Sequence, residues 1–318
     1  MPGESNRAVT LRELVLANLG LVAMVAFWGA FFPVLERLLT TWDAFTITLA
    51  RQLIGTAVLF LAVAIERRTT TLPRVTAWGP ILILGGVGVA FGSLLTSLGV
   101  LYSSGLSSAI ISTTNPIGSA LTAAAVYREP LARGILFGTI LSVIGGLVSV
   151  LGGQSVEGAH FHGGEILIVI ANVTWTWMSM AAQRWLRGYS QLQITAYTVA
   201  AGALWLFLLL PVVAMSGIVT IRVDLRLASL AMVAFAGALP IALGNFFWHY
   251  GVSRIGVVVA SMYNNLLPVA AVAVTVLMGG GFTWWQLLGA AVILVGVFTA
   301  QVLALRRNGK RLALEGSD

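Results

Sequence analysis

The chain has 318 residues, 58% of them hydrophobic and only 9% charged, whereas a soluble domain carries about 25% charged residues. So few charges cannot cover a water-facing surface, and the composition therefore excludes an ordinary soluble protein. The absence of cysteine excludes disulfides, thiolate metal sites and cysteine nucleophiles. The net charge is +7, and the basic residues stand singly in short loops, which indicates membrane orientation rather than nucleic-acid binding.

Ten apolar segments of membrane-spanning length follow one another along the chain. A helix that crosses a bilayer needs about 20 mostly apolar residues, and the links between these segments are short and polar. The sequence predicts helices over residues 15–37, 44–64, 78–101, 106–127, 131–153, 162–184, 191–215, 228–250, 257–279 and 284–305. We therefore expect an all-α membrane protein with ten transmembrane helices.

The first and second halves of the chain resemble each other. Residues 14–151 and 165–302 lie 151 residues apart, and glycines recur at that offset. The matching glycines are Gly86, Gly105, Gly138 and Gly145 in the first half and Gly237, Gly256, Gly289 and Gly296 in the second. Each half holds five predicted helices, and because five is odd, the second half enters the membrane from the opposite side. We predict two inverted five-helix repeats, 1–157 and 158–318, in one integral membrane unit, with the solute path at their interface and alternating access by rocking.

The basic residues are distributed unequally between the two sides of the predicted bundle. Of the 18, 14 fall in the termini and in alternate loops on one side, and Arg37, Arg222 and Arg226 fall in loops on the other. Cytoplasmic loops carry the excess of Lys and Arg. We therefore predict that both termini lie in the cytoplasm. The remaining basic residue, Arg51, lies within a predicted helix.

Arg51 is the only full charge well inside a predicted span. Placing an Arg at the centre of a membrane helix costs at least about 2.5 kcal/mol, so such a residue is a functional hypothesis by default. One interpretation is that Arg51 anchors the carboxylate of a solute. The alternative is a structural residue that bonds to backbone carbonyls or extends its guanidinium outward, and the sequence leaves both open.

Two proline-containing segments occupy similar places in the two halves. Asn115 precedes Pro116 in the fourth segment, and Asn264 and Asn265 lie shortly before Pro268 in the ninth. A proline inside a helix leaves the carbonyl four residues earlier without its donor, and in lipid that carbonyl needs another partner or a wet cavity. We predict that the two breaks face each other across a central cavity, where the amides bind a zwitterion. Hydrogen bonds that hold the bundle together are the alternative.

Trp28 and Trp175 hold related places in the first helix of each half. An interior tryptophan usually packs or faces lipid, but rings combined with a few amides suit a small amphipathic solute. We predict that Trp28, Trp175 and Asn172, which lies one turn before Trp175, contact the solute. We interpret His249, near the cytoplasmic end of its segment, as an interfacial residue.

Several of these motifs together resemble the EamA family of the drug/metabolite transporter superfamily. They are Trp28-Gly29, Arg51, Asn115-Pro116, Arg128-Glu129-Pro130, Gly138 with Gly145, and Gly289 with Gly296. The resemblance implies a multi-pass transporter of the plasma (inner) membrane that exports amino acids and other small metabolites, including aromatic amino acids in the YddG type. One position departs from the family pattern. The family carries a Glu before the last helix of each half, and this chain has Glu129 in the first half but Gly280 in the second.

We therefore predict an alternating-access transporter that exports amino acids, aromatic or otherwise apolar, and related small metabolites. The residues predicted to bind substrate are Trp28, Arg51, Asn115, Asn172, Trp175, Asn264 and Asn265, with helix breaks at Pro116 and Pro268. We expect no catalytic residue, no metal and no cofactor. The expected partners are a small-molecule substrate and the lipid bilayer, without nucleic acid, and the oligomeric state stays open, a monomer being one possibility.

Alternative functions are a transporter of another solute, such as a drug or a sugar phosphate, and an intramembrane enzyme. Ser107 lies in a Gly-x-Ser sequence with His249 as a conceivable base, but the predicted topology puts the two at opposite rims, about 30 Å apart. No Asp or Glu lies at mid-span. A sugar phosphate would call for several interior Lys or Arg side chains, whereas the predicted spans offer one.

Overall fold

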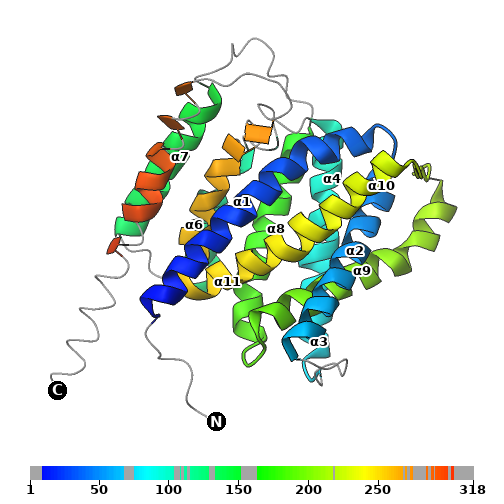
Figure 1. The fold of residues 1–318 in the computed structure, drawn as a ribbon, viewed down its shortest axis with the longest axis horizontal. Helices are drawn as coiled ribbons and strands as arrows, with labels where there is room; N and C mark the ends of the chain where they lie inside the picture. The colour runs from blue at the N-terminus through cyan, green and yellow to red at the C-terminus, as the bar shows by residue number, and fades with distance from the viewer. Residues whose placement is uncertain are drawn as a thin grey trace.

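The computed structural model describes residues 9–67, 75–103, 115–128, 133–151, 163–217 and 219–267, with short stretches between 108 and 112 and between 269 and 303. Every regular element within these residues is helical (Figure 1). The α-helices are α1 (Leu11–Leu39), α2 (Ala44–Arg67), α3 (Trp78–Ile83), α4 (Gly92–Tyr102), α6 (Asn115–Tyr127), α7 (Arg133–Leu151), α8 (Gly164–Trp185), α9 (Gln191–Ser216), α10 (Leu227–Ala236), α11 (Asn245–Ile255) and α12 (Val257–Met262). The π-helical segments η1 (Leu84–Phe91) and η2 (Gly237–Gly244) and the 3-10 turn η3 (Tyr263–Leu266) connect some of them.

Six helical stretches are long and apolar enough to cross a membrane, judged by length and composition. They are Leu11–Leu39, Ala44–Arg67, Trp78–Tyr102, Gly164–Trp185, Gln191–Ser216 and Leu227–Ile255, and each overlaps one of the predicted spans. The all-α membrane class is therefore confirmed. The four other predicted spans, 106–127, 131–153, 257–279 and 284–305, are described only in part.

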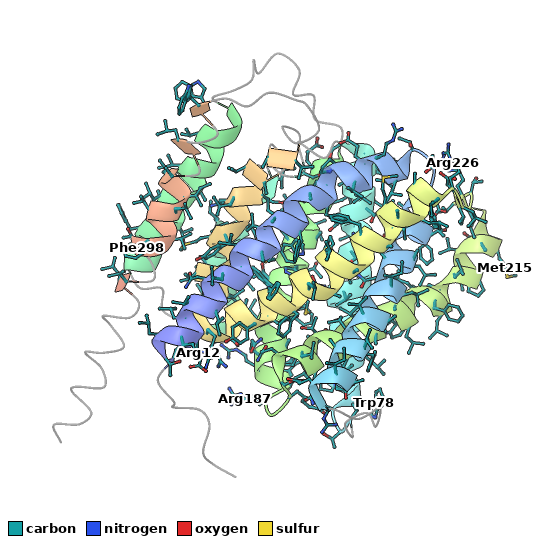
Figure 2. All side chains as sticks on the ribbon, viewed as in Figure 1. Arg12, Trp78, Arg187, Met215, Arg226 and Phe298 are labelled. Carbon is teal, nitrogen blue, oxygen red and sulfur yellow. The ribbon has the colours of Figure 1, made fainter. Side chains whose placement is uncertain are left out.

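Large apolar side chains cover the outside of this bundle. Leu61, Ile65 and Val212 are each more than half exposed, and Met215 is 88% exposed. Figure 2 shows Trp78, Met215 and Phe298 at the periphery of the molecule. So many exposed apolar side chains would be a liability in water, and they suit contact with lipid.

The loops contact one another in two groups at opposite ends of the helices. The backbone N–H of Thr76 donates to the Tyr189 hydroxyl at 3.0 Å, which joins the segment before α3 to the link between α8 and α9. The N–H of Arg222 donates to the Asp43 carboxylate at 2.9 Å, which joins the α1–α2 turn to the α9–α10 link. Figure 2 shows Arg12 and Arg187 at one end of the helices and Arg226 near the other, which agrees with the predicted segregation of charge.

Helices from the two halves of the chain cross closely at a glycine in the third helix of each half. A Cβ added to Gly237 in η2 would lie 2.8 Å from the carbonyl oxygen of Arg51 in α2, and one added to Gly85 in η1 would lie 2.8 Å from that of Thr198 in α9. The second helix of each half therefore packs closely against the third helix of the other half. A larger residue at either glycine would collide with backbone, which cannot rotate away as a side chain can.

The two π-helical segments interrupt the third helix of each half at its middle, a feature that we did not predict. Each widened turn lies beside an indole from a helix of the opposite half. Trp205 Nε1 donates to the Leu82 carbonyl and Trp28 Nε1 to the Pro240 carbonyl, both at 3.0 Å. π-helical turns in α-helices are frequent at functional sites, and η2 forms part of the cavity described next.

Candidate functional site

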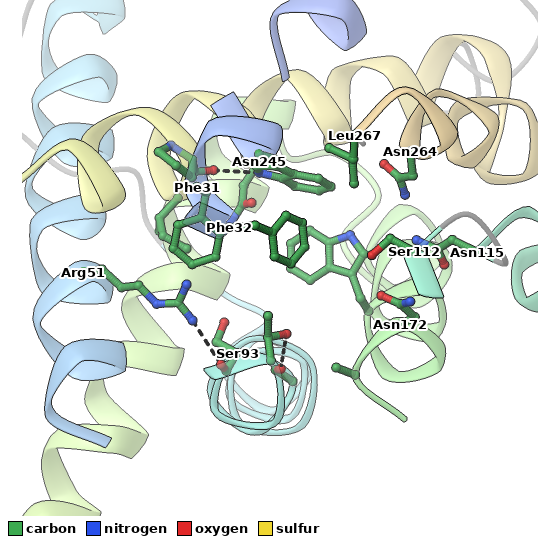
Figure 3. A pocket seen from close by; sticks show the side chains of 17 residues that line it. Phe31, Phe32, Arg51, Ser93, Ser112, Asn115, Asn172, Asn245, Asn264 and Leu267 are labelled. Atoms are coloured by element: carbon green, nitrogen blue, oxygen red, sulfur yellow. Dashed lines mark hydrogen bonds between the residues drawn. The ribbon is translucent and has the colours of Figure 1, made fainter. Parts of the chain in front are cut away.

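A cavity opens between helices of both halves, away from the ends of α1 and α8. Its empty space is about 730 Å³, including the part that is open to solvent. Residues of both halves line it (Figure 3). From the first half these are Trp28, Phe31 and Phe32 of α1, Arg51 of α2, Gly92, Ser93 and Thr96 of α4, Asn115 of α6, and Ser112. From the second half they are Ala171, Asn172 and Trp175 of α8, Pro240 and Ile241 of η2, Asn245 of α11, Asn264 of η3, and Leu267.

Packed tryptophans form the aromatic part of the wall. The rings of Trp28 and Trp175 meet edge to face, with centroids 5.8 Å apart and an interplanar angle of 74°. Trp248 lies against both rings, at centroid distances of 5.8 and 6.4 Å. It is fully buried, and its Nε1 donates to Ser179 Oγ at 2.7 Å. Because Trp248 is fixed from behind, Trp28 and Trp175 present a rigid apolar surface to whatever enters the cavity.

Amide and hydroxyl groups form a second, uncharged part of the wall. Asn115 at the start of α6 accepts a hydrogen bond from Thr176 Oγ1 at 3.4 Å. Asn172 Nδ2 and Asn264 Oδ1 are buried and have no hydrogen-bond partner, and the same holds for Nε1 of Trp175. Buried polar groups are normally paired, so these two donors and one acceptor lack the partners that a bound solute or water could provide.

Arg51 provides the positive charge of the cavity wall. Its Nη2 donates to the Ser93 carbonyl at 3.0 Å and to Ser97 Oγ at 3.1 Å, and its Cζ lies 4.7 Å from the centre of the Phe31 ring. Gln52, the next residue in α2, donates to Ser93 Oγ. The side chain is 2% exposed and its Nε has no partner. The structural and the functional interpretation of Arg51 therefore both keep support, because one edge of the guanidinium is bonded to protein and another is not.

Figure 3 shows the two polar groups of the wall on different sides of the aromatic rings. Arg51 and Ser93 lie on one side, and Asn115, Asn172 and Asn264 lie on the other, with Phe32 between them. A solute that reaches both polar groups must therefore place an apolar body against the rings.

Six of the seven predicted substrate residues lie on the wall of this cavity. They are Trp28, Arg51, Asn115, Asn172, Trp175 and Asn264. Asn265 does not line the cavity: it is fully buried, and neither of its side-chain amide atoms has a partner. Pro116 is buried in α6, and Pro268 lies outside the described residues. Contact of these side chains with a solute remains a prediction.

The interpretation of His249 as an interfacial residue is wrong. His249 is 1% exposed, and its ring lies 6.1 Å from that of Trp175. The prediction failed because it relied on distance along the helix. α11 extends past His249 to Ile255, and the side chain faces inward against α8.

Sequence reasoning also missed Phe31, Phe32, Ser93, Thr96 and Asn245, which all line the cavity. The phenylalanines stand in an apolar run and carry no signal of their own. Ser93 and Thr96 are three residues apart in an apolar span, so their hydroxyls share one helix face. That spacing could have indicated a polar face on α4.

Comparisons with known proteins give a consistent result. The model of the EamA-like transporter family matches residues 15–151 and again residues 162–300. The chain is 26% identical to a protein of Streptantibioticus cattleyicolor named "Probable terminal-alkyne amino-acid exporter", over 93% of this chain and 97% of that protein. It is 25% identical to each of two uncharacterized transporters of Bacillus subtilis. The match to YyaM covers 69% of this chain and 72% of YyaM, and the match to YdfC covers 86% of this chain and 87% of YdfC. A solved structure titled "Crystal structure of protein" superposes with a TM-score of 0.72 at 19% identity, covering 91% of this chain and 98% of that one, and shows the likeness of fold alone.

Proposed function

We propose that this chain, which belongs to the EamA-like transporter family, exports amino acids with apolar or aromatic side chains and related small metabolites across the plasma membrane by alternating access. The family membership confirms the resemblance noted in the sequence, and a multi-pass location in the plasma membrane follows from the family and the apolar helices. A relative named as an amino-acid exporter supports the solute class.

One observation carries this proposal: a buried cation, a rigid tryptophan wall and unpartnered amides line the same cavity. Arg51 suits a carboxylate, and the rings of Trp28 and Trp175 suit an apolar side chain. The family is one of transporters, which points away from the intramembrane enzyme. Ser107, the nucleophile of that alternative, lies outside the described residues, and His249 packs against Trp175.

We propose further that the fold consists of ten transmembrane helices in two inverted repeats, 1–157 and 158–318. The two separate matches to the family model support this division. The reciprocal crossings at Gly85 and Gly237 support it as well, because each joins the second helix of one half to the third helix of the other. In such folds the repeats rock about a central site.

The transport function is tested by efflux and by binding. Cells that express the protein are expected to release preloaded leucine or phenylalanine faster than cells without it, and the purified protein should melt at a higher temperature with a transported solute, because ligand binds the folded state. The proposal would be contradicted if cells that express the protein neither export any amino acid or analogue nor gain tolerance to one. Selective stabilisation by sugar phosphates would favour that class instead.

Neighbouring asparagines provide a matched control in the same assay. Asn264→Ala removes an amide from the cavity wall and is expected to raise the half-saturation constant by roughly 2- to 12-fold, the equivalent of one hydrogen bond of about 0.5–1.5 kcal/mol. Asn265→Ala makes the same chemical change one residue further on, away from the cavity, and should leave that constant unchanged. An equal effect of the two variants would mean that Asn264 acts through packing.

The topology is tested by reporter fusions. The Lys and Arg distribution puts both termini in the cytoplasm, so alkaline phosphatase fused after Gly153 or Gly217 is expected to be active. The same enzyme fused after Arg187 is expected to be inactive, because Arg187 lies at the end that carries the basic loops. Active fusions after Arg187 together with inactive fusions after Gly217 would reverse the proposed orientation.

A further inference from the structure

The cavity wall carries an unbalanced charge. Arg51 is the one charged side chain among the described residues that line it. Its hydrogen-bond acceptors, the Ser93 carbonyl and Ser97 hydroxyl, are neutral, and so is the Phe31 ring. Within the described part of the chain, the ion pairs join Arg226 to Asp224 and Arg254 to Glu13, so neither involves Arg51. Among the described residues, no acidic side chain therefore pairs with the buried positive charge of Arg51.

Charge balance distinguishes between kinds of carboxylate. A buried ion is costly unless an opposite charge pairs with it. A monoanionic carboxylate beside Arg51 would bring the cavity to zero net charge. A zwitterionic amino acid would pair its carboxylate with Arg51 but would also bring in an ammonium group, and the cavity would keep a net charge of +1 with a second ion to desolvate.

The uncharged side of the cavity agrees with this distinction. An ammonium group has three donors and needs acceptors, preferably anionic ones. Apart from Arg51, the buried unpartnered atoms of the wall are two donors, Asn172 Nδ2 and Trp175 Nε1, and one acceptor, Asn264 Oδ1. A secondary amide can donate to Asn264 Oδ1 and accept from Asn172 Nδ2 or Trp175 Nε1, whereas an ammonium group cannot accept from either donor.

We infer that the cavity prefers monoanionic carboxylates with an apolar or aromatic body and an uncharged amide or hydroxyl group, such as N-acylated amino acids, over zwitterionic amino acids of the same size. The carboxylate pairs with Arg51, the body lies against Trp28 and Trp175, and the neutral group faces Asn172 and Asn264. This inference rests on the proposed function, since it names the kind of solute that the same cavity selects.

Three phenylalanine derivatives test the preference in the wild-type protein. At pH 6, N-acetylphenylalanine is an anion, phenylalanine a zwitterion and phenylalaninamide a cation, while all three share the benzyl group. Titration calorimetry of the purified full-length protein should show N-acetylphenylalanine binding about tenfold or more tightly than phenylalanine, because only phenylalanine brings an ammonium group that must be desolvated without an anionic partner. Phenylalaninamide, which lacks the carboxylate, should bind most weakly.

Variants of Arg51 show whether the preference comes from this side chain. Arg51→Gln should bring the affinities for N-acetylphenylalanine and phenylalanine close together, and Arg51→Lys, which keeps the charge, should retain the order. Arg226→Gln removes an exposed cation outside the cavity and should leave both affinities unchanged. If Arg51→Gln does not fold, the order of the three affinities in the wild-type protein and in Arg51→Lys still tests the inference.

The outcomes separate this inference from the proposed function. Phenylalanine binding as tightly as, or more tightly than, N-acetylphenylalanine overturns the inference and leaves amino-acid export in place. An anion preference that survives in a folded Arg51→Gln also overturns it. If none of the three compounds binds, and vesicles containing the protein transport no amino acid, both the inference and the proposed function fail.

Discussion

Gly85→Ala and Gly237→Ala are each expected to destabilise the folded protein and to lower transport with it. At Gly85 a new Cβ would lie 2.4 Å from Ala201 Cβ and 2.8 Å from the Gly202 nitrogen. At Gly237 it would lie 2.6 Å from Ile54 Cβ. Real Cβ atoms do not come this close, so the crossing helices must separate. Overpacking typically costs about 1–3 kcal/mol and sometimes more, and thermal melting of the purified variants measures the loss.

Gly118→Ala is the control for these two variants. Gly118 lies within α6, and a Cβ added there would meet no atom within 4 Å. Since alanine is the better helix former, this variant should melt no lower than the wild type. The paired crossings predict similar losses for Gly85→Ala and Gly237→Ala. Wild-type melting of both variants would contradict the tight crossings, and a large loss in only one would show that the two halves are unequal there.

Trp28→Phe is expected to reduce transport by about fivefold or more. Trp28 forms part of the cavity wall, and its Nε1 donates to the Pro240 carbonyl in the widened turn of η2. Phenylalanine keeps an aromatic ring but removes this donor. A carbonyl left without its partner inside the membrane costs about 1–3 kcal/mol, equivalent to roughly 5- to 150-fold in an equilibrium. Uptake into proteoliposomes measures the effect, and melting of the same preparation reports stability.

Trp205→Phe removes an equivalent hydrogen bond away from the cavity. Trp205 Nε1 donates to the Leu82 carbonyl beside η1, and its side chain is 42% exposed. We expect this variant to lose stability to a similar extent while its transport stays closer to the wild-type rate. If Trp205→Phe loses as much transport as Trp28→Phe, the interrupted helices rather than the cavity wall account for the effect. If Trp28→Phe transports normally, the assignment of Trp28 to the site is wrong.

The polar candidates were the part of the site that the sequence could predict. A polar or charged group within an apolar span is expensive in lipid, so Arg51, Asn115, Asn172 and Asn264 stand out as single residues. The structure brings these four to one cavity. Phe31 and Phe32 could not be selected in this way, because phenylalanine is as suitable toward lipid as toward a cavity.

The direction that a side chain faces could not be predicted from its neighbours in sequence. Asn264 and Asn265 are adjacent and chemically identical, yet Asn264 lines the cavity and Asn265 does not. His249 was expected at an interface and lies inside against Trp175. In a soluble helix the polar face marks the outside. In a membrane helix both the outer and the inner faces are apolar, so the pattern carries little information about facing.

By itself, the sequence determined the class of the protein, its apolar spans and its relation to the EamA family, because a lipid solvent demands long apolar helices and makes each interior polar residue conspicuous. Only the tertiary structure decided which of those residues share a cavity, that Arg51 lies over Phe31 and bonds to α4, and that the third helix of each half is interrupted by a widened turn. These features depend on contacts between segments far apart in the chain, as between Trp28 and Pro240. A local pattern of residues cannot specify such contacts, because the partner of each group is set by how the helices pack.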